Sequence, residues 1–186
     1  MVTKAKERII LGIDPGNVIM GYGIIEQKGN KIQCLTLGVI ALSKYDDIFA
    51  RLQIIYTRTL GLITAYKPDE LAIEAPFYGK NVQSMLKLGR AQGVAMAAAL
   101  HHNIPVFEYA PRKIKMAITG NGNASKEQVS AMLQKTIGIT EIPENFDATD
   151  GLAAAVCHAY QPEIGGDSMT AKSWKEFINK NPGRIK

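Results

Sequence analysis

The chain has few of the features that identify several large classes of protein. Its 186 residues include only two cysteines, Cys34 and Cys157, and neither belongs to a Cys-x-x-Cys pair. This argues against a zinc site or a disulfide framework and is typical of a reducing compartment. The longest apolar run, Val94 to Leu100, is far shorter than the roughly 20 residues that span a bilayer. Because Met1 to Arg8 is polar and short, we predict no signal peptide, a cytoplasmic location and no membrane partner.

The charge of the chain is moderately basic. It contains 22 Lys and Arg residues and 17 Asp and Glu residues, which gives a net charge of +5. A basic balance favours a polyanionic partner such as nucleic acid. Hydrophobic residues make up 46% of the chain, which is ordinary for a single globular domain of this length. The three histidines have no metal-ligand spacing, so we interpret them as structural.

The run from Ile9 to Ile13 is the stretch around which the fold is predicted to form. It is too short for a helix, and it is followed directly by Asp14 and a Pro-Gly turn. Such a run is typical of a strand buried on both faces, at the centre of a mixed or parallel sheet. A carboxylate at its end is costly unless a cation or hydrogen-bond donors compensate it. The alternative is that Asp14 simply caps the turn.

The rest of the chain alternates between strand and helix patterns. Four further strands are predicted, at 19–25, 31–35, 70–74 and 104–108, with a hairpin turn at 28–30. Five helices are predicted, at 46–67, 82–102, 113–119, 125–137 and 146–160. This order predicts an α/β layered fold around a mixed five-stranded sheet. We predict one folded domain over residues 1–161 and a basic C-terminal tail over 162–186, with one short helix that Ser173 and Glu176 cap.

Four acidic residues form the candidate catalytic site. Asp14 and Glu74 each end a buried strand, and Asp147 and Asp150 stand one helical turn apart at the start of the last core helix. Acids in a first turn are also favoured by the helix dipole alone. Converging carboxylates repel one another unless divalent cations hold them, and an oxygen-only ligand set favours Mg²⁺, with Mn²⁺ as a substitute. In a basic protein this predicts metal-assisted hydrolysis of phosphodiester bonds.

Two lysines are candidates for stabilising the transition state. Lys126 opens a helix that Ser125 and Gln128 cap, at a position where the helix dipole disfavours a cation. A locally unfavourable charge often marks a functional position. Lys115 lies on the helix after the fifth strand. Ordinary solvated surface residues are the alternative for both.

The loop after Glu74 is the candidate for contact with DNA bases. Phe77, Tyr78 and Lys80 follow the acid directly, and aromatic residues beside a cation suit stacking on an unpaired base. Packing as core lids is the alternative for the two aromatic residues. The candidate contacts to the DNA backbone are Arg90, Arg112 and Lys113.

A stripe of small residues marks the long helix. Gly89, Gly93 and Ala97 recur at every fourth position, which lets another backbone approach closely. That backbone belongs either to the sheet of the same chain or to the same helix of a second copy.

Five blocks of sequence resemble the RuvC-type Holliday junction resolvases. They run collinearly within Ile9 to Tyr160, and the tail lies outside the resemblance. The blocks are Ile10 to Gly23, Ala72-Ile73-Glu74, Lys87-Leu88-Gly89, Val106-Phe107-Glu108-Tyr109 and Asp147-Ala148-Thr149-Asp150. The resemblance implies a ribonuclease H-like fold and a homodimer that makes paired, symmetric nicks in four-way junction DNA, leaving 5′-phosphate ends, in recombination and repair. It adds branch-migration motor proteins to the candidate partners.

The same resemblance implies roles for individual residues. The acidic metal ligands of the family fall on Asp14, Glu74, Asp147 and Asp150, although some members carry His at the position of Asp147. Two divalent ions are implied to grip the scissile phosphate. Lys115 and Lys126 match lysines beside that phosphate, and Phe77 matches the aromatic residue that wedges into the junction.

Two other functions compete with this interpretation. An actin-like phosphotransferase also has a first strand that ends in Asp, but here Pro15 interrupts the loop, no Ser or Thr closely follows Gly16, and the chain is too short for two lobes. A non-catalytic junction-binding module is the second alternative. The presence of all four acids argues against it.

Overall fold

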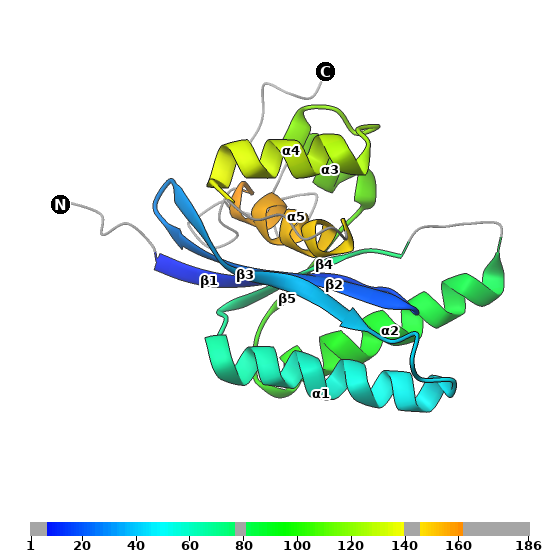
Figure 1. Ribbon diagram of the computed structural model, residues 1–186. Coiled ribbons are helices and arrows are strands. Elements are labelled where there is room, and N and C mark those ends of the chain that lie inside the picture. Colours follow the sequence, from blue (N-terminus) through cyan, green and yellow to red (C-terminus); the bar gives the residue numbers. More distant parts are fainter. Residues whose placement is uncertain (1–6, 77–80, 140–145, 162–186) are drawn as a thin grey trace, which may run out of the picture.

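In the computed structural model, described here for residues 7–76, 81–139 and 146–161, a five-stranded sheet lies between two layers of helices (Figure 1). The sheet order is β3-β2-β1-β4-β5. β1 pairs antiparallel with β2 and parallel with β4, so the sheet is mixed, as predicted. The strands are β1 (Glu7–Asp14), β2 (Ile19–Lys28), β3 (Lys31–Ala41), β4 (Glu70–Glu74) and β5 (Val106–Tyr109).

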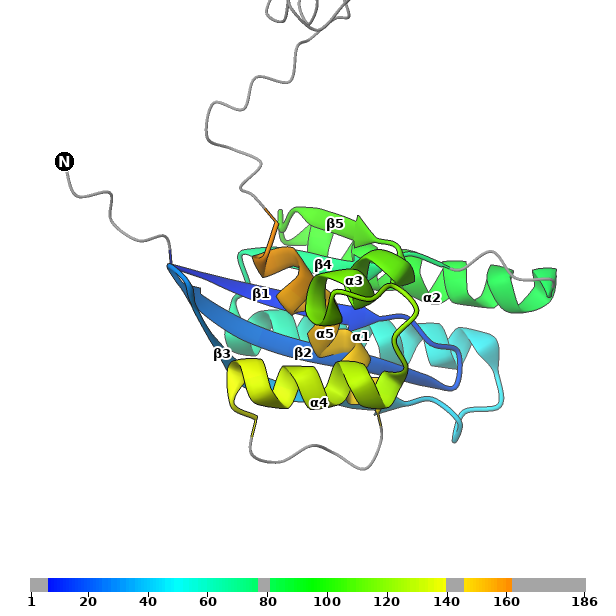
Figure 2. The ribbon, with the colours of Figure 1, turned by 90° about the horizontal axis from the view of Figure 1, so that it is seen from above.

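The helices cover both faces of the sheet (Figure 1). On one face lie α1 (Ile48–Tyr66) and α2 (Val82–His101). On the other lie α3 (Pro111–Thr119), α4 (Lys126–Ile137) and α5 (Asp147–Ala159). α5 packs directly on the sheet, and α3 and α4 lie over it (Figure 2). In the described part of the chain, no helix is long and apolar enough to cross a membrane.

β1 is the central strand and is buried on both sides, as its apolar run predicted. Ile10 belongs to the core beneath α5, whereas Leu11 and Ile13 belong to the core beneath α1 and α2. Alternate side chains of one strand therefore serve two separate cores. This placement makes β1 a rigid support for the residue at its end.

Local signals set several boundaries where they were expected. The Asp47 side chain accepts a hydrogen bond from Ala50 N and caps α1, and the capping box of Ser125 and Gln128 opens α4. α1 ends at Tyr66, just before Pro68. The β2–β3 hairpin turns at Gly29, whose φ of 58° suits glycine.

Several boundaries differ from the prediction; β1, for example, begins at Glu7 and β2 continues to Lys28. β3 continues to Ala41, because residues 36–41 pair in register with residues 19–24 of the neighbouring strand β2. α3 begins at Pro111, where the missing N–H of proline costs nothing in a first turn. β5 begins at Val106 and extends to Tyr109. The C-terminal tail, 162–186, lies outside the described residues.

α5 approaches the sheet unusually closely, and glycines make this possible. A Cβ at Gly21 of β2 would collide with the Asp147 carbonyl oxygen, and a Cβ at Gly151 would lie 2.6 Å from backbone atoms of Gly21 and Tyr22. Apart from Asp150, α5 is buried from Ala148 to Ala159. Glycines on both β2 and α5 thus bring the start of α5 onto the sheet.

This packing predicts opposite effects for two Gly→Ala substitutions. Gly151→Ala should lower the free energy of unfolding by about 1–3 kcal/mol, because the added methyl group overpacks the interface. Gly61→Ala, in the middle of α1 with nothing within 4 Å of the new Cβ, should raise it by up to about 1 kcal/mol through helix propensity. Urea denaturation measures both. Equal effects would contradict the close approach of α5.

Candidate active site

The topology brings four acidic residues to one edge of the sheet. Ile13 of β1 pairs with Ile73 of the parallel strand β4, so the next residues, Asp14 and Glu74, end side by side. On the other side of β1, Asp14 pairs with Gly21. The carbonyl of Asp147 packs on Gly21, which places the first turn of α5 above the same edge.

Three of the four acids lie close enough to bind one metal ion. Asp14, Asp147 and Asp150 each offer an oxygen atom, and these atoms all lie within 4.8 Å of one another. Glu74 lines a cleft of about 480 Å³ together with Asp14 and Asp150. Sequence and structure therefore agree on the placement of all four acids in one site.

Lys126 is the cation at the centre of this cluster. Its Nζ lies 2.9 Å from Asp147 Oδ1 and 2.5 Å from Asp150 Oδ2. Burial lowers the pKa of Lys126, but the hydrogen bonds to Asp150 and Asp147 outweigh it and raise the pKa above its ordinary value. Lys126 therefore stays charged and neutralises part of the acidic cluster.

Two of the acids hold protons unusually tightly. Burial, followed by repulsion from Asp150, raises the pKa of Asp14 from 3.8 to about 7. Burial, followed by repulsion from Asp14, raises the pKa of Glu74 from 4.5 to about 8. A divalent cation would remove this repulsion, because it supplies positive charge at the point where the carboxylates converge.

The turn-capping role considered for Asp14 is not what the structure shows. In the described ranges, no hydrogen bond joins its carboxylate to the turn that follows β1. The side chain instead lines the cleft with Glu74 and Lys126.

The predicted basic residues separate into two groups. Arg112 and Lys115 line the cleft with the acids. Lys113 lies outside it and places its Nζ 5.0 Å from the centre of the Tyr109 ring. Arg90 is exposed on α2 and does not line the cleft either. Phe77, Tyr78 and Lys80 lie outside the described residues.

The structure adds polar residues that the sequence analysis missed. Asn123 lines the cleft, close in sequence to Lys126. A neighbouring groove, lined by Asn17, Ser84 and Lys87 among others, reaches Asp147. Ser84 and Lys87 are three residues apart on α2, and that spacing was a usable signal for a shared polar face.

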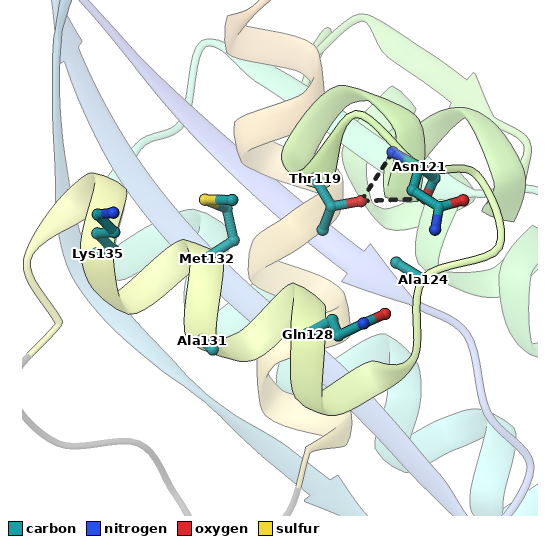
Figure 3. A pocket seen from close by; sticks show the side chains of 7 residues that line it. All are labelled: Thr119, Asn121, Ala124, Gln128, Ala131, Met132 and Lys135. Carbon is teal, nitrogen blue, oxygen red and sulfur yellow. Dashed lines mark hydrogen bonds between the residues drawn. The ribbon is translucent and has the colours of Figure 1, made fainter.

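A second hollow lies between the end of α3 and the outer side of α4 (Figure 3). Thr119 and Asn121 are hydrogen-bonded at its edge, where Asn121 N donates to Thr119 Oγ1 over 3.1 Å. It shares no lining residue with the acidic cleft and contains no acid among its lining residues, which are Thr119, Asn121, Ala124, Gln128, Ala131, Met132 and Lys135. It is therefore separate from the candidate active site.

The raised pKa of Asp14 predicts a pH-dependent stability. Because its pKa is higher in the folded chain than in the unfolded one, folding is favoured at low pH and loses stability as the pH rises from about 4 towards 7. In metal-free buffer, Asp14→Asn should therefore raise the free energy of unfolding by on the order of 2 kcal/mol at pH 8 and by far less at pH 4. Urea denaturation at the two pH values measures the difference.

The control for this measurement is Asp46→Asn, which removes an exposed carboxylate ahead of α1. It should show little difference between the two pH values. An equal gain for Asp14→Asn at pH 4 and pH 8 would contradict the raised pKa.

Comparison with known families agrees with the geometry. The family model "Crossover junction endodeoxyribonuclease RuvC" matches residues 10–158. The protein of that name from Porphyromonas gingivalis is 57% identical over 187 aligned residues, covering 97% of this chain and 98% of its own. The one from Bacteroides fragilis is 56% identical and covers 100% of both chains.

Solved structures give the same result for the fold. Thermus thermophilus RuvC in complex with a Holliday junction substrate has a TM-score of 0.76 and 32% identity, covering 82% of this chain and 93% of that one. The yeast mitochondrial Holliday junction resolvase Ydc2, with 15% identity and a TM-score of 0.60, shares the fold. The fold is thus ribonuclease H-like, as predicted, and the chain belongs to the RuvC family of crossover junction endodeoxyribonucleases.

Proposed function

We propose that this protein resolves four-way DNA junctions by nicking two opposed strands, each through metal-assisted hydrolysis of a phosphodiester bond. The observation that carries the proposal is the convergence of four carboxylates and Lys126 in one cleft of a RuvC-family endonuclease. The solved complex of the T. thermophilus relative with a Holliday junction supports the choice of substrate.

The acidic cluster fits a divalent cation of the Mg²⁺ type. Its ligand atoms are all carboxylate oxygens, three of them within 4.8 Å of one another, which is the donor chemistry that Mg²⁺ and Mn²⁺ prefer. Asp14, Glu74, Asp147 and Asp150 would hold the metal, and we propose two ions per site. Bound there, the metal would supply charge stabilisation and activation of water for attack on phosphorus.

The residues of the chain supply the remaining requirements of the reaction. Asp14 stands at the end of the most buried strand, so its position is fixed before substrate binds. Lys115 and Arg112 place positive charge in the same cleft, where a phosphate group must enter. Lys126 would stabilise the negative charge that develops on the phosphate in the transition state.

A non-catalytic junction-binding module is the competing function. Such a module needs the basic residues but has no use for carboxylates that repel one another and the DNA. The pKa values of Asp14 and Glu74 show how unfavourable that arrangement is without a metal. The cluster therefore supports catalysis over binding alone.

The outer face of α2 supports assembly as a homodimer. Gly89 and Gly93 have nothing within 4 Å of the position of a Cβ, so the stripe does not pack on its own sheet. Val82, Leu86 and Leu100 extend it as exposed apolar side chains, with 64%, 51% and 56% of their surface accessible. We propose that this stripe packs against the same stripe of a second copy, which would supply the second active site for paired nicking.

We further propose that residues 1–161 form the nuclease domain and that 162–186 form an appended tail. The family model ends at residue 158, close to this boundary. We also propose that branch-migration motor proteins bind to this protein.

The decisive test is Asp14→Asn, which keeps the shape of the side chain and removes its charge. It should abolish Mg²⁺-dependent nicking of a synthetic four-way junction, which means that the nicking rate falls by more than about 10²-fold. Junction binding should persist, because affinity comes mainly from Lys and Arg contacts to phosphates. Gel assays of nicking and of binding measure both.

Asp46→Asn serves as the control and should nick like the wild type. Retained nicking by Asp14→Asn would refute the role of Asp14 as a metal ligand. A wild-type protein that binds junctions without nicking them would favour the binding-module alternative.

The dimer predicts a specific effect of a large residue at Gly93. Gly93→Arg should give folded monomers that no longer make paired nicks, because the long charged side chain keeps two α2 helices apart. Gly61→Arg is the matched control, since Gly61 also lies in a helix with open space around it, and it should stay dimeric. Light scattering measures the oligomeric state. A dimeric Gly93→Arg variant would contradict the proposed interface.

A further inference from the structure

A second polar cluster is centred on Arg8, Glu70 and His158, which lie at the opposite ends of β1, β4 and α5 from the acids. Tyr109 pairs with Glu74 at the acidic end of the sheet, and its hydroxyl group reaches this cluster from there. Glu70 Oε2 lies 2.8 Å from Arg8 Nη1 and 2.9 Å from His158 Nε2. His158 Nδ1 in turn lies 2.5 Å from the Tyr109 hydroxyl. Arg8, Tyr109 and His158 are buried. We call these four residues the far-end network.

The hydrogen bonds of the far-end network form one consistent chain. The Glu70 carboxylate is an acceptor only, so Arg8 and His158 Nε2–H donate to it. In the tautomer with its proton on Nε2, His158 accepts at Nδ1 from the Tyr109 hydroxyl. The Phe107 ring lies 4.4 Å from the His158 ring, centroid to centroid. The imidazole is therefore held in one position and one orientation.

Each element that carries a candidate catalytic acid contributes a residue to the far-end network at its other end. β1 has Arg8 near its start and Asp14 at its end, and β4 has Glu70 at its start and Glu74 at its end. In both strands the two residues are an even number of positions apart, so they lie on the face that α5 covers. α5 starts with Asp147 and has His158 in its last turn.

Between its two ends, α5 meets the sheet mainly through small residues. Gly151 and Ala155 pack on Gly12 at contact distances that a Cβ would not allow. Such apolar contacts are strong but have little directional preference. Hydrogen bonds depend on both distance and angle, so the far-end network supplies directional contacts that fix α5 along the strands. At the other end, the acids repel one another without metal.

We propose that the far-end network is a positioning device for the active site: it fixes α5 relative to β1 and β4, so that Asp147 and Asp150 meet Asp14 and Glu74 at metal-binding distance. Arg8, Glu70, Tyr109 and His158 are thus positioning residues that touch neither metal nor substrate. The inference rests on the proposed function, because it concerns the same metal site. A shift of about 1 Å at a catalytic group costs on the order of 10²-fold in rate, so a small displacement of α5 matters.

The test measures the affinity of the protein for Mn²⁺ in the absence of DNA. Electron paramagnetic resonance reports the concentration of free Mn²⁺ during the titration. His158→Leu replaces the imidazole with an apolar side chain of similar size and removes the hydrogen bonds to Glu70 and Tyr109. It should weaken Mn²⁺ binding by about 10-fold, in the range seen when outer partners of metal ligands are removed. His158→Gln, whose amide can still donate to Glu70, should recover most of the affinity. Junction affinity should stay within about twofold, since phosphate contacts determine it.

Two further variants separate positioning from general stability. Ile55→Ala, in the core on the opposite face of the sheet, lowers stability without touching the far-end network and should leave Mn²⁺ affinity unchanged. Glu70→Gln is a milder change that should also weaken Mn²⁺ binding, and it decides the question if His158→Leu does not fold.

Unchanged Mn²⁺ affinity in the network variants would overturn the proposal, as would an equal loss in Ile55→Ala. A wild-type protein that binds Mn²⁺ without nicking junctions would refute the proposed function alone, and the affinity comparison would still decide the positioning role. A wild type that binds no Mn²⁺ would overturn both.

Discussion

Electrostatic repulsion between carboxylates, held together at the edge of a buried sheet, is the constraint on which the rest of this structure depends. At 4.8 Å and an effective dielectric constant of about 20, two unit charges interact by roughly 3 kcal/mol. The chain sustains several such pairs because two acids end rigid strands and two begin a helix that glycines seat on the sheet. Proton uptake by Asp14 and Glu74, and the ammonium group of Lys126, relieve the repulsion while no metal is bound. A divalent cation bound between the carboxylates would relieve the same repulsion.

Lys126 shows how tertiary contacts override a local preference. A cation in the first turn of a helix costs about 0.3–1 kcal/mol through the helix dipole. The Lys126 side chain is 49% exposed, so each of its two ion pairs, to Asp147 and Asp150, stabilises the fold by about 0–1 kcal/mol. Together the two ion pairs offset the local cost. The unfavourable position of Lys126 in the sequence was therefore a sign of its ion pairs with the two aspartates.

The sequence was sufficient where a local pattern carries the physics. Buried runs that end in Asp14 and Glu74 predicted the strands and the shared sheet edge, and the capping box predicted the start of α4. It was insufficient where contacts depend on distant segments. His158 has no informative spacing because its partners, Tyr109 and Glu70, are 49 and 88 residues away. Lys113 and Arg112 are adjacent in sequence, yet only Arg112 lines the cleft, since the rotation of α3 decides which one does. The sequence also left two partners open for the Gly89 and Gly93 stripe, and the open space around these glycines rules out the sheet of the same chain.

The order of these elements along the chain has a consequence for biosynthesis. β1 is made first and α5 last among the described elements, yet α5 packs directly on β1 and β2. Contacts of such large sequence separation form slowly, because a long loop must close before they stabilise anything. A chain emerging from the ribosome can pair β1 with β2 and β3 early, but its acidic cluster has only half of its members until Asp147 has been released, and the fourth follows with Asp150. The active site is therefore completed only after α5 has been synthesised, so a growing chain that still lacks α5 has no complete active site.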